Sequence, residues 1–399
     1  MTDTYDLRLI KTMIDSWFPV GNTNSFAVVD DTNVSSAYSC PQHNVSSLEG
    51  MIDFADSLPD TDLPGCFGLP EGVMFDLKEK SSITVQKLLQ EMTHSVTSGH
   101  AHTSASRHAD TGTQETLLQM VDNITERIPA EIPDNLIDEK IERQGGPDLP
   151  LNKFLLREIS KLNSLLKVVQ SSLGRLRELV DGGHVNHSSV KDLSRNCVPR
   201  EWIKNSDESI ISWLHPQDVN GWLRTLFARH QQLWKWIKNG RPKSYWLPGF
   251  FAKRSFLIAV KQEMLREWRI PNLSLNDVQS RITPQNATSL EELKKGAPAG
   301  SGVFIHDLSL KGAYWDHNTQ SLQKLGNGPI VSSVPVLHYR VECNPQSRST
   351  ESEFKCPVYE YEERGDDNLI DTFRLKTIKH DPSQFVLSGT ALLCTTELS

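Results

Sequence analysis

The chain has 399 residues, of which 37% are hydrophobic, 23% are charged and 8% are aromatic, and its 42 Lys and Arg against 50 Asp and Glu give a formal net charge of −8. This composition is that of a globular protein with length for two or three domains. The acidic balance argues against a dedicated binder of nucleic acid or anionic membranes, which carries a basic face. We therefore expect no nucleic acid and no membrane among the partners.

Targeting and redox signals are sparse. No run of residues approaches the roughly 18–20 uninterrupted apolar positions of a membrane span, and the N-terminus lacks the basic start and apolar core of a signal peptide. The six cysteines lie far apart and form no CxxC pair, so we expect buried or incidental thiols in a reducing cytosol. They are Cys40, Cys66, Cys197, Cys343, Cys356 and Cys394.

The first ninety residues open with a helical pattern, because Leu7, Ile10, Ile14 and Trp17 are spaced by three or four. A second short helical pattern follows over residues 85–92. The next segment, residues 94–113, contains almost nothing that a core could use, so we expect a flexible linker and the main domain boundary there.

Four histidines fall in this linker, namely His94, His100, His102 and His108. A metal site needs ligands fixed at defined spacings with supporting groups around them, whereas these histidines stand among Ser, Thr, Gly and Ala. The pattern favours a solvated loop over a zinc or copper site, and we expect no metal.

A long amphipathic helix is predicted over residues 152–180, where apolar residues recur at three and four. Asn152 is the expected N-cap, and the pair Gly182 and Gly183 is the expected stop. A second helix is predicted between Pro216 and Gly240, with Asp218 at the positive end of its dipole. A third spans residues 255–268, and together the three predict an antiparallel helical bundle.

The run from Trp234 to Lys243 interleaves aromatic and basic residues, a pattern that can stack on nucleotides. Trp234 and Ile237, however, fall on the stripe that the helix needs for its own burial, and basic residues near a helix C-terminus are favoured by the dipole. We interpret the run as core plus a solvated face.

After about residue 300 the hydrophobic period changes from 3.6 to 2. Five runs rich in β-branched and aromatic residues, separated by Gly, Pro, Asn and Asp, predict short strands in a closed or nearly closed antiparallel sheet. They lie at 302–310, 335–343, 354–361, 368–377 and 385–395. The predicted fold class is α+β.

Catalytic motifs are missing from the sequence. It contains no GxxxxGK[ST], HExxH or GxSxG, and the glycines of residues 296–302 precede a β run instead of opening a helix. Carboxylate pairs such as Glu291 and Glu292 or Glu362 and Glu363 stand in polar stretches that are typical of solvated surface. We therefore expect no enzyme, no catalytic residue and no cofactor.

Several longer segments resemble, in order, the C-terminal end of a dynein heavy chain. They are TDTYDLRLI (2–10), LPGCFGLPE (63–71), NGRPKSYWLPGFF (239–251), GVFIHDLSLKGAYWD (302–316), CPVY (356–359) and GTALLC (389–394). The run DTFRLKT (371–377) is similar to the axonemal, outer-arm version of the family.

This resemblance implies a domain plan. Residues 1–93 would be the partial AAA+ lid of the sixth module, 94–113 the linker, 114–299 the helical part of the dynein C-terminal domain, and 300–399 its β-barrel part. The implied partners are the remaining AAA+ ring and the intermediate, light intermediate and light chains, with microtubules bound only through the full-length motor.

The implied function is structural and regulatory, within a minus-end-directed motor that moves cilia. The implied localisation is the cytoplasm, the cytoskeleton and the ciliary axoneme. The chain itself would hold neither an ATPase site nor a microtubule-binding site. A non-enzymatic helical scaffold that binds a partner protein remains the alternative. The residues expected to carry the packing are Trp222, Trp234, Trp246, Phe250, Phe251 and Trp315.

Overall fold

The computed structural model describes residues 4–17, 47–57, 72–99, 107–182, 187–213, 218–268, 279–284, 302–325, 330–342, 352–361, 364–377 and 382–394. The chain divides into two compact units. The helical unit comprises residues 99–278, 297–305 and 396–399, and the sheet unit comprises residues 1–98, 279–296 and 306–395. No helix among the described residues combines the length and the apolarity that crossing a bilayer requires.

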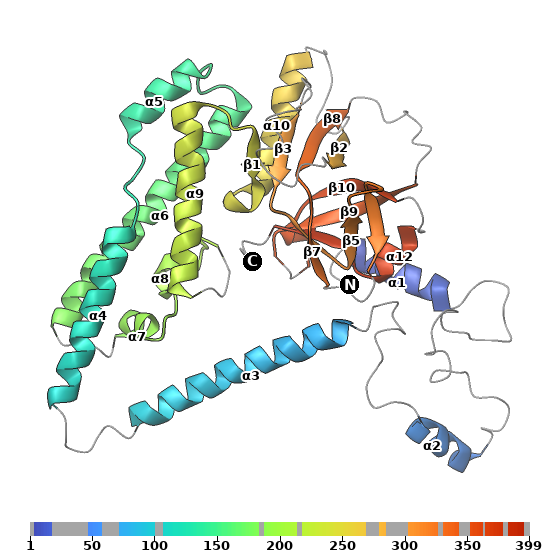
Figure 1. The fold of residues 1–399 in the computed structure, drawn as a ribbon, viewed down its shortest axis with the longest axis horizontal. Coiled ribbons are helices and arrows are strands. Elements are labelled where there is room, and N and C mark those ends of the chain that lie inside the picture. Colours follow the sequence, from blue (N-terminus) through green and yellow to red (C-terminus); the bar gives the residue numbers. More distant parts are fainter. Residues whose placement is uncertain are drawn as a thin grey trace. The chain divides into compact units, whose positions relative to one another are not determined.

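Helices build the helical unit, and Figure 1 shows α4 lying along α6. Its elements are α4 (Arg107–Arg127), α5 (Asp134–Arg143), α6 (Pro150–Asp181), α7 (Ser188–Ser194), α8 (Arg200–Ile203), α9 (Val219–Asn239), β1 (Ser244–Trp246), η2 (Leu247–Gly249) and α10 (Lys253–Trp268). All but the last residue of the strand β3 (Val303–His306) also belong to this unit. The three helices predicted from periodicity are thus present as α6, α9 and α10.

The start of α6 differs from the prediction. Leu149 is the N-cap and Pro150 opens the first turn, while Asn152 lies inside the helix. The Asn152 side-chain amide donates to the carbonyl oxygens of Gln144 and Gly146, at 3.2 Å and 2.8 Å, so it ties the helix to the preceding turn. The predicted stop is confirmed, because Gly182 is the C-cap.

The ends of α9 follow the expected chemistry. The Asp218 carboxylate accepts a hydrogen bond from the Gly221 amide at 2.8 Å, and Gly240 follows the last turn with a φ of 85°. Pro216, which was expected in the first turn, lies outside the described residues. The helix buries Trp222, Leu226, Leu233, Trp236 and Ile237.

The sheet unit contains three helices from the first hundred residues, α1 (Thr4–Trp17), α2 (Leu48–Ser57) and α3 (Gly72–Gly99). The opening helix is therefore confirmed. The ends of the expected linker, residues 94–99 and 107–113, are helical in α3 and α4, and residues 100–106 lie outside the described part. The four-segment domain plan remains a prediction.

The remaining elements of this unit follow residue 278. They are β2 (Gln279–Pro284), β4 (Ser309–Lys311), β5 (Ala313–Asp316), β6 (Ser321–Lys324), β7 (Val331–Ser333), β8 (Leu337–Glu342), β9 (Ser352–Tyr359), η4 (Asp366–Asn368), β10 (Leu369–Thr377), α12 (Pro382–Leu387) and β11 (Ala391–Leu393). Seven strands form one sheet in the order β5-β6-β10-β9-β11-β4-β7, and β2 pairs with β8 antiparallel.

The expectation of a closed or nearly closed antiparallel sheet is wrong in its pairing directions, and the described strands form no closed barrel. The seven-strand sheet is mixed, because β10 pairs with β6 and β11 pairs with β9 in parallel. The described strands also leave the sheet open, with β5 and β7 at its edges. Alternating hydrophobicity predicts that a strand exists and which face it buries, but it does not name the partner strand. The α+β class is confirmed.

The last predicted strand is also shorter than expected, because residues 382–387 are the helix α12. Pro382 fits a first helical turn. Gly389, with a φ of 59°, donates its amide to the Val386 carbonyl, and the Thr390 amide donates to the Phe385 carbonyl at 2.8 Å. This turn closes the helix and directs the backbone into β11.

Candidate functional site: a buried arginine clamp and a hollow beside α1

The most constrained polar group of the helical unit is Arg229 on α9, whose side chain is 1% exposed. Its Nη1 donates to the Gly249 carbonyl at 2.8 Å and its Nη2 to the Pro248 carbonyl at 3.0 Å. Burying a guanidinium costs several kcal/mol unless hydrogen bonds and charge compensate it. Here backbone carbonyls of η2 supply part of that compensation.

Aromatic rings enclose the same guanidinium. Its Cζ lies 4.3 Å from the Trp213 ring centroid, 5.4 Å from that of Phe251 and 5.9 Å from that of Trp246. Ring faces attract a cation most strongly where water is excluded, as at this buried site. The contacts join the segment before α9 to the segment after it.

Glu158 on α6 binds the backbone of the two residues Phe251 and Ala252, which follow the carbonyls that Arg229 binds. Its carboxylate, also 1% exposed, accepts from the Phe251 amide at 2.7 Å and the Ala252 amide at 3.0 Å. Burial raises the pKa of Glu158, against the lowering effect of these two amides and of the charges of Lys161 and Arg229. We name the set Glu158, Arg229 and residues 248–252 the arginine clamp.

Two further side chains fix the flanks of the clamp. Gln232 accepts from the Trp246 amide at 2.8 Å and donates to its carbonyl at 3.2 Å, so its amide group acts as a neighbouring strand would. Glu263 on α10 accepts from Arg241 Nη2 at 2.5 Å and from the Leu151 amide, in the first turn of α6, at 3.3 Å. The bonds to Trp246 and Arg241 join α9 and α10 to the segment 239–252, and the bond to Leu151 joins α10 directly to α6.

The packing residues expected from the sequence lie in different surroundings. Trp246 and Phe250 are buried and Phe251 is half-buried, all beside the clamp. Trp222 is fully buried between Trp202 and Trp213, at ring distances of 5.0 Å and 5.1 Å. Their role as packing anchors remains a prediction.

The other two expected residues lie apart from this cluster. Trp234 is half-buried and stacks on His230, with ring centroids 6.1 Å apart. Trp315, 5% exposed, pairs with Leu322 between β5 and β6 in the sheet unit. The deeper tryptophan on the last turns of α9 is Trp236, whose ring lies 4.9 Å from that of Tyr245.

Sequence reasoning missed Glu158 and Arg229, although both left a signal. Glu158 stands three residues after Leu155 and four before Leu162, on the apolar stripe of α6. Arg229 stands at the same spacing between Leu226 and Leu233 on α9. A charged residue at a stripe position of each helix indicates a buried, compensated pair.

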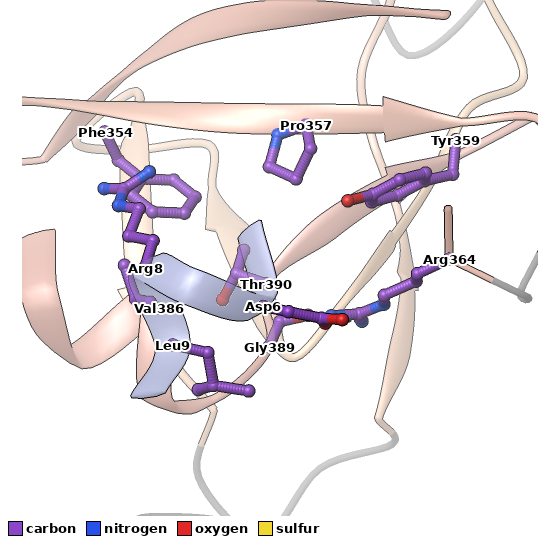
Figure 2. Close-up of a pocket in the computed structure, with 10 residues that line it drawn as sticks. All are labelled: Asp6, Arg8, Leu9, Phe354, Pro357, Tyr359, Arg364, Val386, Gly389 and Thr390. Atoms are coloured by element: carbon purple, nitrogen blue, oxygen red, sulfur yellow. The ribbon is translucent and has the colours of Figure 1, made fainter. Parts of the chain in front are cut away.

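A small hollow in the sheet unit lies between α1, β9 and α12, as Figure 2 shows. Its volume of about 40 Å³ has room for a few water molecules and no larger ligand. It is lined by Asp6, Arg8, Leu9, Phe354, Pro357, Tyr359, Arg364, Val386, Gly389 and Thr390.

Two arginines border this hollow. Arg8 on α1 donates to the Lys355 carbonyl at 3.3 Å and lies 5.3 Å above the Phe354 ring. Arg364 donates to the Gly389 carbonyl at 2.6 Å, and its Cζ lies 6.0 Å from the Tyr359 ring centroid. The hollow is therefore a contact between the first helix and the last strands, with both cations already engaged.

Metal-ligating clusters are not found in the part of the protein that the structure describes, where no three His, Cys, Asp or Glu side chains converge. Of the four linker histidines, His100 and His102 lie outside the described residues. The arginine clamp lies within the helical unit, and the hollow beside α1 lies within the sheet unit.

Comparison with known proteins gives a consistent set of relatives. The family model that describes the C-terminal domain of dynein heavy chains matches residues 79–394. The chain is 28% identical over 402 residues to dynein axonemal heavy chain 5 of Mus musculus, and 28% identical over 408 residues to the dynein gamma chain of the flagellar outer arm of Chlamydomonas reinhardtii. In each case 99% of the chain is covered, and it spans only about 8% of the relative's length.

These relatives correct one expectation. The protein was expected not to be an enzyme, whereas dynein heavy chains are ATPases, that is, motor enzymes. The absence of a phosphate-binding loop concerns only these 399 residues. They match the C-terminal region of those proteins. The family match also contradicts the alternative of a scaffold unrelated to dynein.

Proposed function

Because the chain belongs to the family of C-terminal domains of dynein heavy chains, we propose that it is the C-terminal structural and regulatory part of an axonemal dynein heavy chain. In this role it contributes to minus-end-directed movement along microtubules, and so to ciliary movement, as part of the dynein complex. Its place is the axoneme, a part of the cytoskeleton, as the names of the axonemal and flagellar relatives suggest.

The observation that carries the proposal is the contact between α1 and the last strands. Arg8 reaches Lys355 across 347 residues of sequence, and Figure 1 shows α1 beside α12 within the sheet unit. A displacement of the backbone that leads into α1 is then passed to the sheet as a rigid-body movement. In the proposal, residues 1–93 end the lid of the sixth AAA+ module, and 114–299 and 300–399 form the helical and sheet parts of the C-terminal domain.

The arginine clamp supports the same role from the helical unit. Glu158, Arg229 and Gln232 hold the segment 246–252 through backbone bonds to both its amides and its carbonyls. A segment held in this way has few alternative conformations, so α6, α9 and α10 move together. Such a stiff body can bias the conformational equilibrium of a ring against which it rests. The proposed partners are the AAA+ ring and the intermediate, light intermediate and light chains.

The test uses the full-length heavy chain that contains this sequence. Arg8→Ala removes the bond to Lys355 and the ring contact with Phe354, while Lys11→Ala on the exposed face of α1 is the matched control. We expect Arg8→Ala to slow microtubule gliding and to lower microtubule-stimulated ATP turnover, and Lys11→Ala to leave both unchanged. Unchanged gliding by the Arg8 variant, and by a heavy chain from which residues 300–399 are deleted, would contradict the proposal.

A further inference from the structure

One stretch of the sequence carries charge of a single sign. Residues 219–262 contain nine Lys and Arg and no Asp or Glu, in a protein whose net charge is −8. The stretch covers α9, β1 and most of α10. Arg229 and Lys253 of this block are buried and Arg241 pairs with Glu263, so the block indicates an electrostatic interaction surface only where its other, exposed cations gather.

Five exposed residues run along α9 in a single line. Their spacing of three, four, four and three residues places them within an arc of about 80° at about 100° per residue. The face of α9 opposite this line is buried in the helical unit. We name the line the outer stripe of α9. It consists of Arg224, Phe227, Gln231, Lys235 and Lys238.

The cations of the outer stripe have no acidic side chain as a partner within the described residues. Arg224, Lys235 and Lys238 form no ion pair there. The helix α5 contacts α9, and its Glu139 pairs with Arg143 of its own helix. Phe227 adds an apolar group to the stripe, because 52% of it is exposed. The surface thus combines three available cations with one apolar anchor.

We propose that the outer stripe of α9 binds an acidic segment of another polypeptide. A spacing of three and four residues is that of the seam along which two helices meet, with an apolar residue at the seam and charges beside it. A partner helix with Glu or Asp at matching positions pairs with Lys235 and Lys238 and covers Phe227. This proposal does not depend on the proposed function.

An acidic polypeptide fits the stripe better than a nucleic acid does. Arg224 and Lys235 are eleven residues apart, which is about 16 Å along the helix axis. Sites for single-stranded nucleic acid combine dense cations with several exposed rings for base stacking. On α9, which the structure describes in full, Phe227 is the one exposed aromatic residue, and Trp234 is half-buried against His230.

The test measures binding of a fluorescein-labelled peptide by the 399-residue protein. The probe is a peptide of about 20 residues, Glu-rich with a Leu in each second turn, and its anisotropy is followed at about 50 mM and about 200 mM salt. The variant combines Lys235→Glu with Lys238→Glu. The control combines Lys153→Glu with Arg157→Glu, which are exposed on α6 and change the net charge by the same amount.

We expect the probe to bind the unaltered protein, with a Kd that rises with salt, and the α9 variant to weaken binding by about tenfold or more. The α6 control should keep the original Kd, and Phe227→Ala should weaken binding without changing its salt dependence. If circular dichroism shows that the α9 variant unfolds, Lys235→Gln with Lys238→Gln replaces it. Absence of binding, an equal loss in the control, or tighter α9-dependent binding of an oligonucleotide of equal charge would each overturn the proposal.

Discussion

Glu158 and Arg229 hold one short segment at its two ends, since Arg229 binds the carbonyls of Pro248 and Gly249 and Glu158 binds the amides of Phe251 and Ala252. The two charges therefore compensate each other partly through the backbone between them. Removing either one leaves the other buried without its counterpart, which typically costs about 3–5 kcal/mol.

This relationship predicts strong coupling between the two positions. We expect Arg229→Met and Glu158→Leu each to lower the free energy of unfolding by about 3–5 kcal/mol, and the double variant to lose less than the sum. Urea denaturation followed by tryptophan fluorescence measures all three. Arg157→Met, an exposed neighbour of Glu158, serves as the control and should change stability by less than about 0.5 kcal/mol. Additive losses in the double variant would show that the two charges act independently.

Trp222 tests the packing role predicted from the sequence. Its ring is fully buried between Trp202 and Trp213, so Trp222→Ala should cost about 3–5 kcal/mol of stability. Phe227→Ala on the exposed side of the same helix should cost little. Thermal melts of the two variants make the comparison, and an unchanged melting temperature for Trp222→Ala would remove Trp222 from the core.

Substituting alanine at two glycines should change the stability of the protein in opposite directions. A Cβ at Gly249 would overlap the Trp246 ring, whereas a Cβ at Gly174, inside α6, meets nothing within 4 Å. Gly249→Ala should therefore destabilise the protein by about 1–3 kcal/mol, and Gly174→Ala should stabilise it by roughly 0.5–1 kcal/mol through helix propensity. Chemical denaturation measures both changes. Equal effects at the two sites would contradict the tight approach at Gly249.

His338 on β8 predicts a dependence of stability on pH. Burial, aided by the nearby charge of Arg340, lowers its pKa to about 4, against about 6.5 in the unfolded state. Between those values the unfolded state binds more protons, so stability contributed by neutral His338 is complete above about pH 6.5 and is lost as the pH falls toward 4, by roughly 3 kcal/mol. His338→Gln should flatten this part of the stability profile. His317→Gln, at an exposed turn, controls for the loss of an imidazole elsewhere in the chain.

The cysteines should differ in reactivity. Burial raises the pKa of the Cys356 thiol to about 12, and Cys394 is also buried, whereas Cys197 is exposed. Only thiolates react readily with iodoacetamide, so Cys197 should be alkylated in the native protein and Cys356 only after unfolding in urea. Peptide mass spectrometry measures each site. Rapid native labelling of Cys356 would contradict its placement in β9.

Periodicity predicted the helices well because burial of one face is a local property of the sequence. The stripe of α6 and the glycine that ends it were visible in the residues, and so were the capping Asp218 and the terminal Gly240 of α9. The N-cap of α6 was misplaced, because Asn152 bonds to the preceding turn, a contact that depends on the path of residues 144–146.

The sheet and the clamp were less predictable, because both depend on contacts between residues distant in sequence. The pairing of β10 with β6 and of β11 with β9 could not be derived from alternation alone. Glu158 and Arg229 are 71 positions apart in the sequence. The apolar spacing of α6 does not identify Arg229 as a partner, and that of α9 does not identify Glu158. The aromatic-rich segment drew attention to the correct region, but the charged groups that fix it were overlooked.

The position of β11 determines how the sheet unit responds to a nonsense mutation. The strand lies inside the seven-strand sheet, between β9 and β4. All three of its residues pair with β4, and Leu392 and Leu393 pair with β9. A stop codon at Ala391 would remove this strand and divide the sheet in its interior, while the ten other described strands would still be translated. β9 and β4 would each expose an unpaired edge, and such edges promote aggregation.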